Sequence, residues 1–193
     1  MSMDARLAQP NGLASGVTHR PIAMWHPDLS IAALRIAIGL FFLKALWTKM
    51  DGVLIAGAVP FLDVHERWIS LMPKIVARQT AENPIGWYKL FLDHIVIPHT
   101  ILFAHLTAWG ETLVGVSLTL GLLSGCGAIG GLLLSVSYGL AAQHLSPASF
   151  GLHYLLVAAM PVLFLARSGK VLGLDAVIAR RAHQSWLTAR PWS

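Results

Sequence analysis

Long apolar runs separated by short polar or glycine-rich stretches dominate the second half of the chain and recur once near its start. Four of these runs come close to the roughly 20 residues that an α-helix needs to cross a bilayer. They cover residues 29–47, 100–123, 127–145 and 147–166. The last three are joined by short links, which predict antiparallel neighbouring helices. The pattern therefore predicts an all-α membrane protein built as a four-helix bundle.

Residues 50–98 interrupt the apolar pattern with a stretch that is balanced in charge and rich in aromatic residues. Phe61, Trp68, Met72 and Ile75 recur at helical spacing, and an Asn-Pro pair at residues 83–84 ends that pattern. Such a segment is typical of an amphipathic helix that lies on the membrane or on the bundle. We expect an extracytoplasmic helical cap between the first two membrane helices.

Composition supports a membrane protein and shapes the predicted domain organisation. Apolar residues make up 55% of the chain and charged residues 12%, whereas soluble domains carry about 25% charged residues. We divide the chain into a polar N-terminal segment (1–28), a membrane domain (29–166) and a basic tail (167–193). The tail suits contact with anionic lipid headgroups. No basic, aromatic-rich face accompanies it, so nucleic acid is not an expected partner.

The distribution of lysine and arginine predicts how the chain lies in the membrane. Residues 1–28 lack an apolar core, so no cleavable signal peptide is expected. Four spans place both termini on one side, and the tail is denser in basic residues than the long loop. The positive-inside rule then predicts a multi-pass inner-membrane protein with both termini in the cytoplasm.

Three ionisable residues fall inside the predicted spans, namely Arg35, Lys44 and Glu111. Each costs roughly 2.5–3.5 kcal/mol on insertion scales unless it is compensated. Arg35 and Glu111 are expected at similar depths, so we predict that they form a contact. That contact has two readings, a structural link that sets helix register or a proton or quinone site. Lys44 faces the other way and is expected to extend its ammonium to the membrane surface.

Several histidines gather in the part of the topology expected near the outer surface. His105 and His153 are the candidates for binding a cofactor, with a quinone as the expected group. The histidines that gather there show no i, i+3 or i, i+4 pair. A helix-borne metal site is therefore not predicted.

Three stretches resemble the DoxX/DoxD family of small membrane proteins. They are LRIAIGLFFLKALWTKMDG, WGETLVGVSLTLGLLSG and ARSGKVLGLD. The residues at the family's motif positions are Arg35, Gly39, Lys49, Glu111, Gly115, Gly121, Leu174 and Asp175. The long cap resembles the DoxD branch more than the shorter DoxX proteins.

The resemblance implies a membrane subunit of a quinone-linked oxidoreductase similar to thiosulfate:quinone oxidoreductase. It implies a second protein subunit as partner, a small sulfur anion as substrate, and Arg35 and Glu111 as candidate catalytic residues. The alternative is a non-catalytic scaffold or anchor subunit of another redox complex. A small transporter ranks below both, because no inverted repeat or pair of broken helices is evident.

Overall fold

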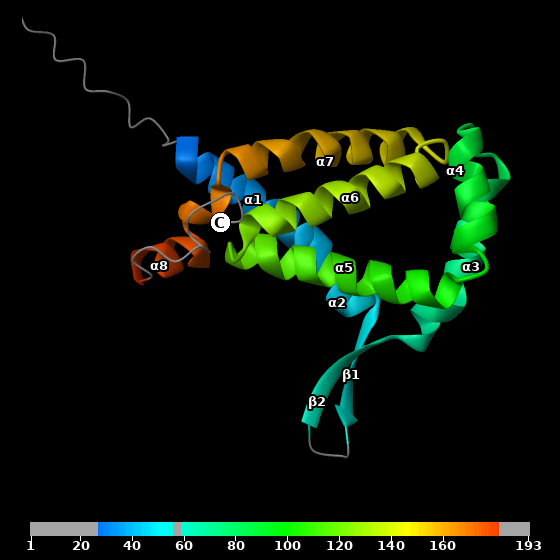
Figure 1. The fold of residues 1–193 in the computed structure, drawn as a ribbon, viewed down its shortest axis with the longest axis horizontal. Helices are drawn as coiled ribbons and strands as arrows, with labels where there is room; N and C mark the ends of the chain where they lie inside the picture. The colour runs from blue at the N-terminus through cyan, green and yellow to red at the C-terminus, as the bar shows by residue number, and fades with distance from the viewer. Residues whose placement is uncertain (1–26, 56–58, 182–193) are drawn as a thin grey trace, which may run out of the picture.

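Four long helices form the membrane bundle in the computed structural model, which describes residues 27–55 and 59–181 (Figure 1). They are α1 (Pro27–Leu43), α5 (Thr100–Leu120), α6 (Ser124–Ala142) and α7 (Pro147–Leu165). A break at Lys44 separates α1 from a further turn, α2 (Ala45–Thr48). In the described part of the chain, four helical stretches are long and apolar enough to cross a membrane. The predicted all-α four-helix bundle is therefore confirmed.

The helices pack in chain order, α1 against α5, α5 against α6 and α6 against α7. One end of the bundle, here the tail end, carries the short 3-10 helix η2 (Ser168–Lys170) and helix α8 (Leu174–Arg181). The opposite end, here the cap end, carries the segment between α2 and α5. Residues 1–26 of the expected N-terminal segment and residues 182–193 of the expected basic tail lie outside the described residues.

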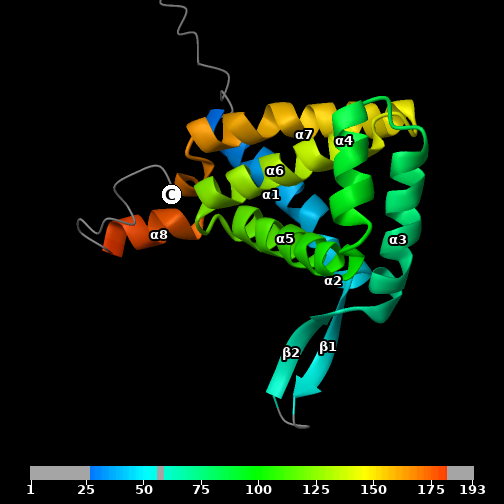
Figure 2. The same ribbon diagram turned by 45° about the vertical axis from the view of Figure 1, so that its right-hand side comes forward.

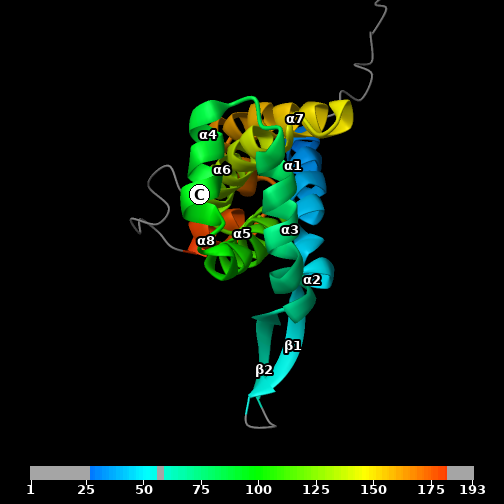
Figure 3. The ribbon, with the colours of Figure 1, turned by 90° about the vertical axis from the view of Figure 1, so that its right-hand side faces the viewer.

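The cap contains helices, as expected, and also a β-hairpin that was not expected. Strands β1 (Met50–Ile55) and β2 (Val59–Val64) pair antiparallel, with Met50 opposite Val64. Helices α3 (Glu66–Ala81) and α4 (Gly86–Phe91) and the π-helix η1 (Leu92–Val96) follow. Figures 2 and 3 show α3 and α4 side by side across the end of the bundle, with the hairpin projecting from it.

The amphipathic helix of the cap begins later than its sequence pattern suggested. Phe61 belongs to β2, and α3 starts only after His65, whose Nδ1 accepts a hydrogen bond from the Arg67 N–H at 2.9 Å. This hydrogen bond satisfies one of the free N–H groups at the start of α3. Met72 and Val76 form the buried face of α3.

Two hydrogen bonds attach the cap to α6. The Asn83 side-chain amide donates to the Leu140 carbonyl at 3.0 Å, and the Tyr88 hydroxyl donates to the Ser137 carbonyl at 2.8 Å. Burial raises the pKa of the Tyr88 hydroxyl, so the group stays protonated and remains a donor. The cap is therefore fixed to α6 at two successive turns.

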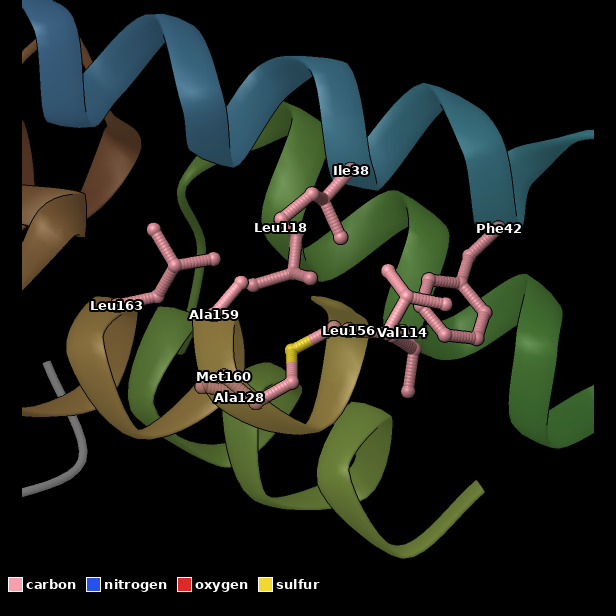
Figure 4. Close-up of a cluster of buried hydrophobic side chains, with 9 residues drawn as sticks. All are labelled: Ile38, Phe42, Val114, Leu118, Ala128, Leu156, Ala159, Met160 and Leu163. Atoms are coloured by element: carbon pink, nitrogen blue, oxygen red, sulfur yellow. The ribbon is translucent and has the colours of Figure 1, made fainter. Parts of the chain in front are cut away.

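The bundle core is a continuous cluster of apolar side chains from all four long helices (Figure 4). It contains Ile38, Phe42, Val114, Leu118, Ala128, Leu156, Ala159, Met160 and Leu163. Small residues let the helices approach: Gly127, Gly131 and Ser135 of α6 are all buried. Their four-residue spacing places them on one face of the helix, and small residues allow close helix contacts in lipid.

Candidate functional site

Arg35 is completely buried near the tail end of α1, where its guanidinium binds backbone carbonyl groups. Nη1 donates to the carbonyls of Ser168 at 2.5 Å and Val171 at 3.2 Å, and Nη2 donates to that of Leu172 at 3.0 Å. All three carbonyls lie in the chain that follows α7. A guanidinium offers five donors in a fixed plane, so it can hold several carbonyls at once. Arg35 thereby ties the segment after the last span to the first span.

Asp175 is the acidic residue of the same region and is 3% exposed. Its carboxylate accepts hydrogen bonds from the N–H groups of Leu123 and Ser124 at 2.8 and 3.0 Å, and from the Ser124 hydroxyl at 2.8 Å. Those N–H groups open α6, where a negative charge is favourable. The Asp175 N–H donates to the Gly121 carbonyl at 2.9 Å. Arg35, Gly121, Ser124, Ser168 and Asp175 form what is here termed the tail-end centre.

Glu111 lies far from that centre and has different partners. Lys49 Nζ forms an ion pair with Glu111 Oε1 at 2.7 Å, and the Tyr138 hydroxyl donates to the same oxygen at 2.6 Å. The side chains of Lys49 and Glu111 are only 13% and 12% exposed. Lys49 Nζ also lies 4.1 Å from the centre of the Trp68 ring, a distance that allows cation–π attraction. With His153 these residues form the cap-end centre.

The predicted contact between Arg35 and Glu111 is therefore wrong, and the packing of α1 on α5 explains why. Gly39 lies against the backbone of α5 at Thr119, and Gly115 lies against the last turn of α1. In this antiparallel register Glu111 is level with the end of α2, twelve residues beyond Arg35. At 1.5 Å per residue the two side chains start about 18 Å apart along the bundle. Each ionisable group is compensated separately.

A pocket of about 270 Å³ adjoins the cap-end centre. It is termed the polar pocket, and its walls include Phe42, Lys44, Lys49, Glu111, Tyr138 and His153. Lys44 is exposed, with its ammonium 5.1 Å from the centre of the Phe41 ring, and its extension to the membrane surface stays a prediction. Ligand pockets usually measure about 300–1,000 Å³. The polar pocket is therefore suited to a small ion or a single ring.

The two histidines expected to bind a cofactor line different hollows. His153 lines the polar pocket, with Nδ1 2.6 Å from the Ser149 carbonyl. His105 lines a shallow depression at the start of α5 together with His99, and its Nδ1 is 2.8 Å from the Ile101 carbonyl. In both rings a Nδ1–H faces a carbonyl, which leaves Nε2 as the free position. Cofactor binding by either histidine stays a prediction.

Clusters of three or more metal-binding side chains are absent from residues 27–55 and 59–181. Residues 30–190 match the family described as TQO small subunit DoxD, where TQO denotes thiosulfate:quinone oxidoreductase. The chain belongs to the DoxD family. No curated protein and no solved structure matches it. The resemblance carried by the three motifs is confirmed.

The motif residues of this DoxD chain divide between three places in the bundle. Arg35, Gly121 and Asp175 belong to the tail-end centre, and Lys49 and Glu111 belong to the cap-end centre. The remaining motif glycines lie where α1 crosses α5. The family pattern thus marks two polar centres and the helix contact that fixes the distance between them.

Sequence reasoning missed the partners of both candidate catalytic residues. Lys49 takes the place beside Glu111 that had been assigned to Arg35, and Tyr138 was not considered. The sequence contained a signal for both Lys49 and Tyr138. A tyrosine inside a span needs a partner for its hydroxyl, and Lys49 lies in the family motif. The carbonyl partners of Arg35 could not be found from local sequence, because they lie 133 to 137 residues away along the chain.

Proposed function

We propose that this DoxD chain is the membrane subunit of a quinone-linked oxidoreductase of the thiosulfate:quinone oxidoreductase type. It serves, with a second protein subunit, to pass electrons from a reduced sulfur anion to quinone in the bilayer. The cap-end centre is the observation that carries this proposal. There an ion pair, a phenol and an imidazole adjoin one pocket within an apolar bundle. Ionisable groups at membrane depth typically mark substrate or proton pathways.

The charges around the polar pocket favour a small anion. Two ammonium groups, Lys44 and Lys49, line it with one carboxylate, Glu111. The Lys49 charge is matched by Glu111 at 2.7 Å, which leaves the exposed Lys44 ammonium in excess. A cleft with low-dielectric walls and one sign of excess charge concentrates ions of the opposite sign. A reduced sulfur anion such as thiosulfate is therefore the proposed occupant.

The same centre offers groups that hold protons, which quinone reduction requires. A bound quinone supplies an acceptor for two electrons and two protons. The Tyr138 hydroxyl already donates to Glu111 Oε1, so a phenol proton and a carboxylate are joined by one hydrogen bond. His153 Nε2 is the free ring position beside them. These residues fit a proton-exchanging site, whereas both terminal nitrogens of Arg35 bind backbone carbonyl groups, which gives Arg35 a structural role.

The proposal includes an inner-membrane location with both termini in the cytoplasm and the cap outside. Arg180 and Arg181 of α8 lie at the tail end, where the positive-inside rule favours the cytoplasm. The polar pocket, lined by Lys44 and Lys49 near the end of the first span, then lies toward the outer surface. A sulfur anion reaches it without crossing the bilayer.

A non-catalytic anchor for another redox protein is the second candidate. The feature that favours it is the closed network of Lys49, Glu111 and Tyr138 with Trp68, which links α5 and α6 to the cap. Such a network serves assembly without chemistry. Replacement of Glu111 separates the two functions, because a proton-transfer role needs the carboxylate and an anchoring role needs only its hydrogen bonds.

The test uses the chain purified with its co-purifying partner and reconstituted in liposomes that contain ubiquinone. Thiosulfate-dependent quinone reduction is followed by absorbance for the wild type and for Glu111→Gln. We expect the variant to keep its fold with reduced stability, because Lys49 loses its counter-charge while the amide oxygen still accepts hydrogen bonds from Lys49 and Tyr138. Its rate is expected to fall at least about 100-fold, the lower end of the contribution of one acid–base group. Asp28→Asn, at the exposed start of α1, is the control and retains the full rate. Full activity in Glu111→Gln excludes the proton role, and a partner-bound wild type without activity supports the anchor function.

A further inference from the structure

A second hollow lies against the same histidine, outside the bundle. It is a groove of about 280 Å³ between α6 and α7, termed the lipid-facing groove. Its walls include Val136 and Gly139 of α6, Gln143 directly after that helix, and Phe150, His153 and Val157 of α7. Tyr154, on its rim, is 67% exposed. Because both helices are candidate spans, hydrocarbon chains of the bilayer face this groove.

The lipid-facing groove changes character along its length. Gln143 at the end of α6 and His153 of α7 provide polar groups toward the cap end. Val136 and Val157 lie one to two turns deeper and leave that part apolar. A molecule with a polar ring and an apolar tail matches this order, with the ring beside His153 and the tail directed toward the bilayer centre. Ligand sites combine apolar walls and a few polar groups in this way.

His153 lines the polar pocket and the lipid-facing groove alike. Its Nδ1 is held by the Ser149 carbonyl at 2.6 Å, and its ring meets that of Tyr138 edge to face, with centroids 6.2 Å apart. The imidazole is thereby oriented from its own helix and from α6. It stands between a hollow lined by ammonium groups and a hollow lined by apolar side chains.

We propose that the two hollows take different substrates, with the quinone ring bound in the lipid-facing groove and the sulfur anion in the polar pocket. This inference rests on the proposed function and adds to it a place and an entry route for the quinone. The quinone enters sideways from the bilayer between α6 and α7. Reduction of the quinone to the quinol takes two electrons from the oxidation of the sulfur anion and two protons. His153, reachable from both hollows, is the residue through which these protons pass to the quinone side.

Gly139 gives a direct way to close the groove. A Cβ at this position meets one near neighbour, the Cβ of His153 at 3.4 Å, so a larger side chain fills the groove without striking the backbone. Gly151 of α7 is the matched control, because a Cβ there has nothing within 4 Å. Gly139→Leu and Gly151→Leu add the same atoms to the same helix pair, one inside the groove and one outside it.

The experiment measures binding rather than turnover. The purified chain is placed in lipid nanodiscs, and quenching of its tryptophan fluorescence is titrated with decylubiquinone and with tail-free ubiquinone-0. We expect Gly139→Leu to weaken decylubiquinone binding at least about tenfold, which is the range that overpacking produces. Gly151→Leu and the smaller Gly139→Ala are expected to bind as the wild type does. Tail-free ubiquinone-0 lacks the tail that would contact Val136 and Val157, so it is expected to bind the wild type more weakly than decylubiquinone does.

The outcomes separate this inference from the proposed function. A wild type that binds neither quinone contradicts both. If Gly139→Leu binds decylubiquinone as tightly as the wild type does, only the assignment of the quinone to the lipid-facing groove is contradicted. Photolabelling of the wild type with an azido-decylquinone needs no variant: label within residues 136–157 supports the groove, and label confined to other helices overturns it. Displacement of decylubiquinone by an equal concentration of a decyl compound without a quinone ring identifies a lipid site instead and also overturns it.

Discussion

Replacement of Arg35 by methionine tests whether the tail-end centre is structural. The substitution keeps a long side chain in a fully buried position and removes all three hydrogen bonds to the chain after α7. Hydrogen bonds to a charged group contribute about 1.5–3 kcal/mol each, so simple addition gives roughly 5–9 kcal/mol. Addition overstates the loss, because the three bonds share one donor group and the freed segment can reach water. Measured losses for breaking buried charged networks are about 3–5 kcal/mol.

We therefore expect Arg35→Met to lower the free energy of unfolding by about 3–5 kcal/mol. At about 2–4 °C per kcal/mol for a chain of this length, the melting temperature falls by roughly 6–20 °C. Unfolding in bicelles, followed by steric trapping, measures the free energy directly. Arg35→Lys, which keeps the charge but cannot hold several carbonyls in one plane, falls between the wild type and Arg35→Met.

Lys44→Met serves as the control, because this cation belongs to the same span but is exposed. Its loss should stay within about 0.5 kcal/mol. The structural assignment of Arg35 is refuted if Arg35→Met unfolds within 1 kcal/mol of the wild type, or roughly the value of one ordinary hydrogen bond. It is equally refuted if that variant keeps its stability and loses quinone reduction, because Arg35 then acts in the chemistry.

Three further substitutions test the packing and the two centres. Gly115→Val should prevent normal assembly, seen as loss of the monodisperse peak in size-exclusion chromatography, because even a Cβ would come within 2.7 Å of the Leu43 backbone. Tyr138→Phe removes the hydrogen bond to Glu111 and should cost about 1–2 kcal/mol of unfolding free energy in bicelles. Asp175→Asn offers one acceptor oxygen in place of two, and the loss of a helix cap costs about 1–2 kcal/mol. The melting temperature should therefore fall by roughly 2–8 °C. An unchanged melting temperature contradicts the capping role.

The membrane-spanning helices were predictable from sequence because hydrocarbon allows few backbone conformations. A chain that crosses hydrocarbon must satisfy its backbone internally, so long apolar runs report helices directly. The face of α6 formed by Gly127, Gly131 and Ser135 followed from its four-residue spacing. These features depend on local sequence alone.

The hairpin and the ion-pair partners were not predictable in the same way. Short apolar runs such as residues 53–62 fit a strand or a helix equally well by periodicity. Phe61 of this run was therefore counted as the first position of the helical pattern that continues at Trp68. The partner of Glu111 depends on the register of α1 against α5. That register follows from which backbone each glycine meets, Gly39 at Thr119 and Gly115 at the last turn of α1, and sequence shows only the glycines.

The bond between Arg35 and the carbonyl of Ser168 joins residues 133 positions apart, which has a consequence for biogenesis. Ribosomes add about 5–20 residues per second, so the first helix waits roughly 7–27 s before its carbonyl partners have been made. During that interval its guanidinium sits in a nascent protein without its final contacts. Translation must therefore run past the last membrane helix before the first one is secured, and products that stop short of this point are expected to be cleared by membrane proteases.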